Sequence, residues 1–387
     1  MKSILNWTQK YYFLAMLLIF FVSFLLPVST KTVNNIFYAG LACPILVWFF
    51  LRPLLGWSLL SSFLWVLVPL LFVAVLTASE AHDLKVILYL FSYFVLCIYF
   101  AGREALVKKA IALFSLIVLG VFFYIVVDWA FIWFESGVVV RYQQLFGVAV
   151  NPVYLSIIIV FSLVYLWVFT LDDWFSTSSR FLFFAGFLCF CSLVLLCVSV
   201  FQSRSTLLGF ILFYIGYIWF KRIIWQGFAL GIGVVFSLYL LGVDALLSQR
   251  ALSYRPEIWF DAATRLINEC SVLIGCGKDN YFFLGEFHHA HSGFLSVFYQ
   301  AGLLGGGAFL FFMCLFFFYA FRARSRWMCV SLIGWGSLLT TTNGVFISPQ
   351  PLWIYFWFPV FMAVLELKNG FIESYYVKRG GLCLSSF

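Results

Sequence analysis

Three of the four histidines of this chain lie within four positions of one another, at His288, His289 and His291. Histidine can accept or donate a proton near working pH, and it is also a common metal ligand. A metal site is one interpretation, because His288 and His291 would share a face if this segment were helical. The hydrophilic sequence around them offers no second ligand cluster, so we predict no metal. We favour His291 as a general base, with His289 in a supporting role.

Two arginines stand where they can bind an anion. Arg204 follows a long apolar run, and Arg255 precedes Pro256, a residue suited to the first turn of a helix. A guanidinium presents paired donors to phosphate and keeps its charge, and a helix N-terminus also favours anions. The alternatives are an Arg204 that only reaches the lipid headgroups and an Arg255 that only pairs with Glu257. Nearby arginines and the dipole of the following helix would keep His291 neutral.

Two further arginines lie in the same segment. Arg265 is four positions after Asp261, a spacing that predicts a solvated ion pair on one helix face. Arg250 has no such partner in the pattern, and we retain it as a supporting candidate.

The composition defines the class of protein that carries these residues. Of the 387 residues, 65% are hydrophobic and only 10% are charged, whereas soluble domains carry about 25% charged residues. This predicts an integral membrane protein and excludes nucleic-acid binding or a large soluble catalytic domain as its main activity. Apolar runs of about 20 residues favour helices over a barrel, so we expect an all-α polytopic membrane protein.

The apolar runs predict about twelve transmembrane helices. With both termini in the cytoplasm, the inside segments hold 15 of the 23 lysines and arginines, which obeys the positive-inside rule. The chain then divides into nine helices over 1–242, a long periplasmic loop over 243–292, and three helices with a cytoplasmic tail over 293–387. The expected spans are 11–29, 36–51, 58–78, 85–102, 110–134, 152–171, 181–201, 206–220, 223–242, 293–320, 327–343 and 351–366.

The long loop has its own local structure. Ile258, Trp259, Ala262, Leu266 and Ile267 recur at helical spacing and predict an amphipathic helix over 256–268.

After this helix, Gly275-Cys276-Gly277 indicates a turn, and Ser292 is a candidate N-cap of the tenth transmembrane helix. Cys270 and Cys276 face a compartment that is oxidising in a Gram-negative periplasm, where a small disulfide is possible.

Motifs that the sequence lacks restrict the mechanism. There is no G-x-x-x-x-G-K-[ST] phosphate loop, no G-x-G-x-x-G after a strand and no H-E-x-x-H. Nucleotide hydrolysis, dinucleotide chemistry and that class of zinc protease therefore lack their usual parts, and we expect no cofactor. A site on the outer face needs a substrate that arrives already activated, and a lipid-linked diphosphate is a natural carrier.

The motifs together resemble the superfamily of O-antigen ligases, O-antigen polymerases and protein O-oligosaccharyltransferases. The resemblance covers roughly 141–306, and Ser292 stands where the family has asparagine. Both residue types cap helices. The matching elements are His289–Leu295 with Gln300–Gly305 for H-x-H-N-x-x-L…G-L-x-G, Arg255 with Trp259 for R-x-x-x-W, Gly275-Cys276-Gly277 for a glycine turn, Ser203-Arg204 for S-R, and Asn151-Pro152 after Gly147 for an upstream element.

The resemblance to the ligases implies inverting, metal-independent glycosyl transfer. The donor would be a glycan on undecaprenyl diphosphate and the acceptor a hydroxyl of lipid A–core, at the periplasmic side of the bacterial inner membrane. Arg204 and Arg255 would hold the diphosphate, and His291 would take the proton from the acceptor.

Two other functions stay open at this stage. A polymerase of the same superfamily would need to accommodate two polyprenyl carriers, and the single compact loop with H-x-H favours the ligase. A transporter or flippase of lipid-linked sugar would place polar residues near mid-membrane, whereas the candidate groups here cluster near one surface.

Overall fold

The computed structural model describes residues 2–51, 60–78, 84–177, 179–240, 254–277, 281–285, 287–341 and 344–367. It is 79% helical, as predicted for an all-α membrane protein. Arg250 and parts of the predicted spans 58–78, 223–242 and 327–343 lie outside the described residues.

Within this part of the chain, six helices are long and apolar enough to cross a membrane, namely Thr30–Leu51, Leu84–Ala101, Glu104–Ser136, Pro152–Ser176, Arg180–Phe201 and Gly293–Arg322. Shorter apolar helices are Tyr11–Ser23, Leu64–Thr77 and Trp353–Leu367.

The helices follow the apolar runs of the sequence, and each predicted span contains a helix among its described residues. The only strands in the described part of the chain are two antiparallel strands of two residues each, which form a hairpin. In chain order the elements are α1 (Lys2–Ser23), α2 (Thr30–Phe37), η1 (Tyr38–Ala42), α3 (Cys43–Leu51), α5 (Leu64–Thr77), α6 (Leu84–Ala101), α7 (Glu104–Ser136), β1 (Gln144–Leu145), β2 (Val148–Ala149), α8 (Pro152–Leu166), η3 (Trp167–Leu171), α9 (Asp172–Ser176), α10 (Arg180–Phe201), α11 (Arg204–Lys221), α12 (Ile224–Leu240), α14 (Arg255–Asn268), α15 (Gly293–Arg322), α16 (Arg326–Leu338) and η4 (Trp353–Trp357).

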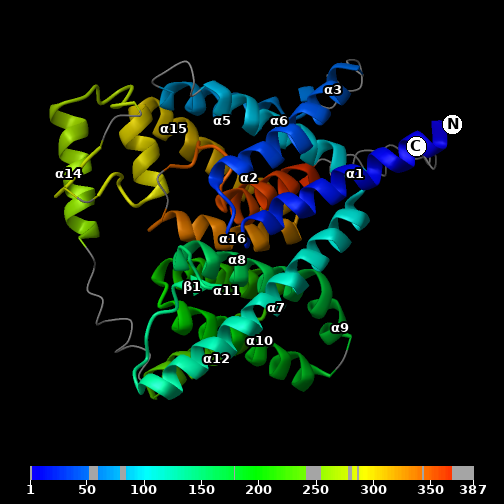
Figure 1. Cartoon of the computed structure of the whole chain (residues 1–387), viewed down its shortest axis with the longest axis vertical. Coiled ribbons are helices and arrows are strands. Elements are labelled where there is room, and N and C mark those ends of the chain that lie inside the picture. The colour runs from blue at the N-terminus through cyan, green and yellow to red at the C-terminus, as the bar shows by residue number, and fades with distance from the viewer. Residues whose placement is uncertain are drawn as a thin grey trace.

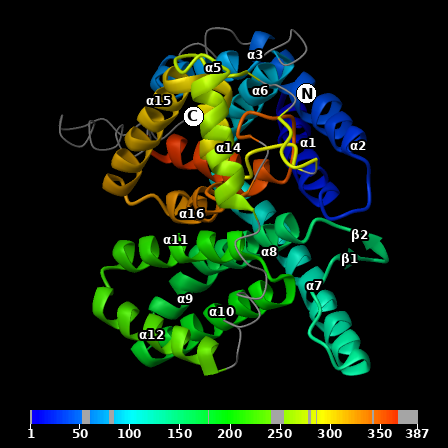
Figure 2. The same cartoon turned by 90° about the vertical axis from the view of Figure 1, so that its left-hand side faces the viewer.

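The core lies around α8, α16 and the helix Trp353–Leu367, whose residues are almost all buried. α11 packs closely on α16, and glycine at position 209 permits this approach. A Cβ atom on Gly209 would lie only 2.7 Å from the carbonyl oxygen of Ile333. Figure 2 shows α8, α10, α11 and α12 in one layer and α5, α6, α15 and α16 in another, with α14 lying across the outside of the bundle.

The bundle has two chemically different ends, with α14 at one and α9 at the other (Figure 1). The α9 end is closed by ion pairs. Lys221 Nζ lies 2.6 Å from Asp172 Oδ2, and Arg326 binds both oxygens of Asp173 at 2.6 and 2.7 Å. The Asp172-Asp173 pair therefore holds helices together at this end. The α14 end carries the candidate residues for chemistry.

Candidate active site

The predicted loop helix over 256–268 is confirmed as α14. Ile258 and Ala262 are fully buried against Tyr281, Ala290 and Tyr299, which form a small core separate from that of the bundle. The phenol of Tyr281 donates to the main-chain oxygen of Ile258 (3.2 Å) and to Asp261 Oδ2 (2.9 Å). One prediction for this face is wrong. Ile267 is 66% exposed, whereas its neighbour Leu266 packs against the small core.

The predicted ion pair on α14 is confirmed. Arg265 Nε lies 3.0 Å from Asp261 Oδ2, and the same guanidinium donates to the main-chain oxygen of Phe282 at 2.9 Å. Arg265 thus joins α14 to the loop at Phe282.

A break in α15 joins the loop to the bundle. At Gly302 the backbone leaves the helical conformation (φ 61°, ψ −161°), which frees carbonyl and amide groups on either side. Residues 272–277 satisfy these groups. The bonds run from the amides of Cys276 and Gly277 to the oxygens of Tyr299 (2.8 Å) and Gln300 (2.9 Å), and from the amides of Leu303 and Leu304 to the oxygens of Val272 (2.9 Å) and Leu273 (3.0 Å).

Glycine is required on both sides of this contact. A Cβ on Gly302 would lie 2.4 Å from the carbonyl of Leu273, and one on Gly275 would lie 2.5 Å from the carbonyl of Gln300. Both glycines also have positive φ angles. The predicted glycine turn is therefore a backbone-to-backbone contact, and the Cys270–Cys276 disulfide, which the sequence left open, closes its loop.

The histidine segment follows this contact. The rings of His289 and His291 lie 4.1 Å apart between centroids, and His288 instead packs on Phe282 at 4.9 Å. His291 has a φ of 50°, and residues 288–291 form no helix. The helical face that a His288–His291 metal site would have used is therefore not formed. Among the described residues, no group of three or more histidine, cysteine, aspartate or glutamate side chains is placed to hold a metal ion.

The pKa values of both paired histidines are lowered. Burial, the charge of His289 and the charge of Arg255 lower the pKa of His291 to about 4, in that order of size. Burial and His288 lower the pKa of His289. The sequence predicted a neutral His291 but attributed it to arginines and a helix dipole, whereas the largest cause is burial. Arg255, the first residue of α14, is close enough for its charge to lower the pKa of His291, whose ring lies 4.1 Å from that of His289. The structure therefore brings these three residues together.

Arg204 is the first residue of α11, and the last residue of that helix, Lys221, pairs with Asp172 of α9. Arg204 therefore lies at the end of α11 away from α9. The start of that helix is fixed by buried hydroxyls that connect α8, α11 and the chain after α16. In both overall views the start of α14 is the end of that helix nearer to the layer of α8 and α11 (Figures 1 and 2). The hydroxyl contacts are Ser156 with Thr206 (2.6 Å), Ser203 with Thr206 (2.7 Å) and Thr340 with Ser205 (2.8 Å).

Residues upstream of α8 help to hold the start of α11 and of α8 in place. Arg141 Nε donates to the oxygen of Phe201 at 2.8 Å, so the segment before the β1–β2 hairpin holds the end of α10 just before Arg204. Asn151 caps α8, accepting from the amide of Val153 at 3.0 Å. Ser292 caps α15 as predicted, accepting from the amide of Leu295 at 3.4 Å.

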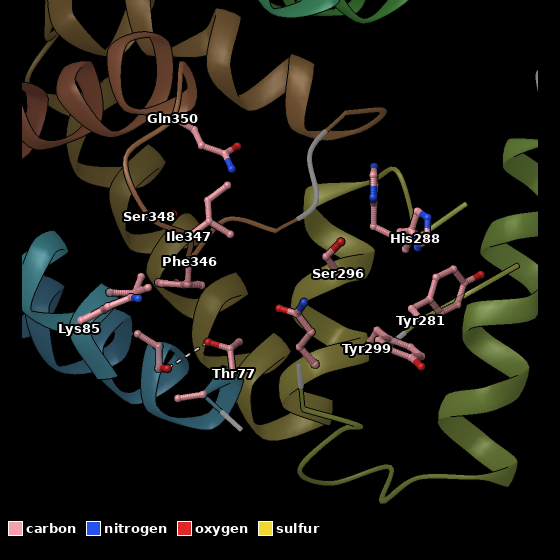
Figure 3. Close-up of a pocket in the computed structure, with 16 residues that line it drawn as sticks. Thr77, Lys85, Tyr281, His288, Ser296, Tyr299, Phe346, Ile347, Ser348 and Gln350 are labelled. Carbon is pink, nitrogen blue, oxygen red and sulfur yellow. Dashed lines mark hydrogen bonds between the residues drawn. The ribbon is translucent and has the colours of Figure 1, made fainter. Parts of the chain in front are cut away.

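A cavity of about 390 Å³ opens beside the histidine pair, and the sequence analysis did not predict it. His288 and His289 line it, and Lys85, Gln300 and Gln350 come from three other parts of the chain. Figure 3 shows Lys85 on α6 and Thr77 on α5 across the cavity from His288 and Ser296. Lys85 was the one sequence feature that could have indicated this cavity. Like Arg204, it is a cation at the end of an apolar span, and the predicted topology places it on the outer side.

Comparison of the chain with known protein families, curated proteins and solved structures finds no match.

We predict that the pKa of His291 is about 4 in the native protein and rises when Arg255→Gln removes the neighbouring positive charge. A nearby cation penalises the imidazolium, so its loss favours protonation, while burial keeps the pKa below the ordinary value of 6.5. A pH titration of ¹³C-labelled histidine by NMR measures this, with the resonance assigned from His291→Gln. Arg180→Gln, a change to an exposed residue at the start of α10, should leave the value unchanged. A native pKa near 6.5 would contradict the prediction.

We also predict that Gly302→Ala destabilises the protein by roughly 2–4 kcal/mol, since it adds left-handed strain to a steric clash with Leu273. The matched control is Gly307→Ala on the same helix, where no atom lies within 4 Å of the new Cβ. Denaturant unfolding in detergent compares the two variants. Equal stability of both would show that the contact with residues 272–277 does not depend on Gly302.

Proposed function

We propose that the protein is an O-antigen ligase, a membrane glycosyltransferase that moves a glycan from undecaprenyl diphosphate to a hydroxyl of lipid A–core. The observation that carries this proposal is the partly buried His289–His291 pair beside the charge of Arg255. A neutral imidazole next to a guanidinium offers a proton acceptor and a phosphate-binding group in one place. The resemblance of the surrounding motifs to the ligase family supplies the substrates.

We further propose twelve spans, cytoplasmic termini and a periplasmic α14 end in a Gram-negative inner membrane. The excess of basic residues in the predicted inside segments supports this orientation. The Cys270–Cys276 disulfide at the α14 end agrees with it, because disulfides persist in oxidising compartments such as the periplasm.

In the proposed reaction, the acceptor oxygen forms a bond to the anomeric carbon as the bond from that carbon to the diphosphate oxygen breaks. His291 takes the proton of the acceptor hydroxyl. The undecaprenyl diphosphate leaves with the bonding electron pair, and its new negative charge is stabilised by Arg255 and Arg204. A single displacement inverts the configuration, and the residues of this chain supply all the proposed groups without a cofactor or metal.

The contributions of the arginines and of His291 to the rate can be estimated from the sizes that such groups have in enzymes generally. Preplaced donors that stabilise a developing negative charge contribute about 3–4 kcal/mol each, and general base catalysis contributes about 10²–10⁴-fold. A diphosphate is already a good leaving group, so we expect the arginines to matter at least as much as the histidine.

Depletion of the protein in a smooth Gram-negative strain should remove all long glycan chains from lipid A–core, while full-length polymer accumulates on the lipid carrier. Electrophoresis of lipopolysaccharide and analysis of the lipid-linked glycan measure both. Single repeat units on the core would instead indicate a polymerase. Loss of long chains with lipid-linked sugar accumulating on the cytoplasmic side would favour a transporter.

In the purified protein, Arg255→Ala and His291→Ala should each reduce transfer by about 10²–10³-fold, with no sensitivity to chelators. Arg180→Ala, at an exposed site on α10, is the matched control and should retain full activity. Transfer of a radiolabelled glycan to lipid A–core gives the rates. Full activity of both site variants would reject these roles for Arg255 and His291.

A further inference from the structure

The cavity beside the histidine pair has a lining suited to a polar anionic ligand. Among the described residues, Lys85 is the one cation that lines it, and no carboxylate does. The remaining polar groups are amides, hydroxyls and the imidazoles of two histidines. They belong to Thr77, Ser296, Gln300, Ser348, Gln350, His288 and His289.

The polar groups are held in place by the surrounding backbone. The hydroxyl of Thr77 donates to the oxygen of Ala74 at 3.0 Å, which leaves its own oxygen as an acceptor. The main chain of Gln300 is fixed by Gly277 at 2.9 Å, and that of Gln350 accepts from the amide of Trp353 at 2.9 Å. Figure 3 shows Lys85, Ser296 and Gln350 arriving from separate elements around one space. Its volume of about 390 Å³ falls within the range of small-molecule sites.

Aromatic rings complete the lining. Tyr281 and Tyr299 contact each other edge to face at 5.4 Å between centroids, and both line the cavity. Phe346 contributes a third ring. Planar amides, hydroxyls and aromatic rings together can contact both the polar edge and the apolar face of a sugar ring.

His289 connects the cavity to the proposed reaction centre. It lines the cavity, and its ring lies 4.1 Å from that of His291. Arg255 and His291 do not line the cavity. In a displacement at the anomeric carbon, the attacking hydroxyl approaches from the side opposite the leaving diphosphate. If the diphosphate is bound by Arg255, the cavity is the place from which the acceptor reaches the histidines.

We propose that this cavity is the acceptor subsite and that Lys85 pairs with an anionic substituent, phosphate or carboxylate, on the accepting glycan. The inference rests on the proposed function, which supplies the acceptor. A lysine ammonium binds such a group as a point charge, and the neighbouring amides and hydroxyls bind the sugar. Lys85 is then a specificity residue that favours charged over neutral acceptors.

The test uses the full-length protein in phosphatidylcholine vesicles and two acceptors, a phosphorylated glycolipid and its phosphatase-treated form. Lys85→Gln should raise KM for the phosphorylated acceptor about tenfold or more, as expected for the loss of a charged hydrogen bond. It should leave kcat, and KM for the neutral acceptor, within about twofold. Lys85→Arg should restore the preference. Lys31→Gln, an exposed lysine of α2, is the matched control. An equal effect on both acceptors, or no effect on either, would overturn the proposal.

A binding measurement separates this proposal from the proposed function. Acetylation of Lys85, followed by mass spectrometry, should be slowed by the phosphorylated acceptor and not by the neutral one. Protection without any transfer by the native protein would support the subsite and reject the ligase. Transfer without protection would support the ligase and overturn the subsite. Equal protection by added phosphatidylglycerol would assign the cavity to a lipid headgroup and also overturn the proposal.

Discussion

The backbone contact between residues 272–277 and the break in α15 is the constraint on which the site depends. A helix that breaks at Gly302 exposes amides and carbonyls that must find partners, and the loop supplies four hydrogen bonds. That pairing fixes the distance of the loop from the bundle. The small core around Tyr281 adds a second attachment, because it includes Tyr299 of α15 together with Ala290 of the histidine segment. Backbone bonds and the packing of this core thus position the histidines together.

The two ends of the bundle use different interactions. At the α9 end, direct ion pairs such as Lys221 with Asp172 join helices that are distant in sequence. Around Arg204 the joining groups are buried hydroxyls, including the Ser156–Thr206 and Thr340–Ser205 contacts. Neutral hydroxyls position helix ends without adding charge. The hydroxyl contacts around Arg204 therefore add no carboxylate that would compete with an anionic substrate.

The sequence predicted features that depend on local spacing. α14, the Ser292 cap and the Asp261–Arg265 pair each follow from residues a few positions apart, and all three are confirmed. Features that depend on tertiary contacts were not predicted. The cavity joins Lys85, His289 and Gln350, which no local pattern connects, and the burial that lowers the pKa of His291 arises from tertiary packing, which residue spacing does not show.

The positions of Arg255 and His291 have a consequence for the proposed reaction. A base with a pKa of about 4 is a weak proton acceptor, although it is unprotonated at neutral pH. Under the proposed function, the diphosphate brings negative charge to Arg255, and that charge offsets the cation that penalises imidazolium. A nearby anion raises the pKa of a histidine. Donor binding would therefore make His291 a stronger base, so that proton transfer from the acceptor becomes more favourable once the leaving group is in place.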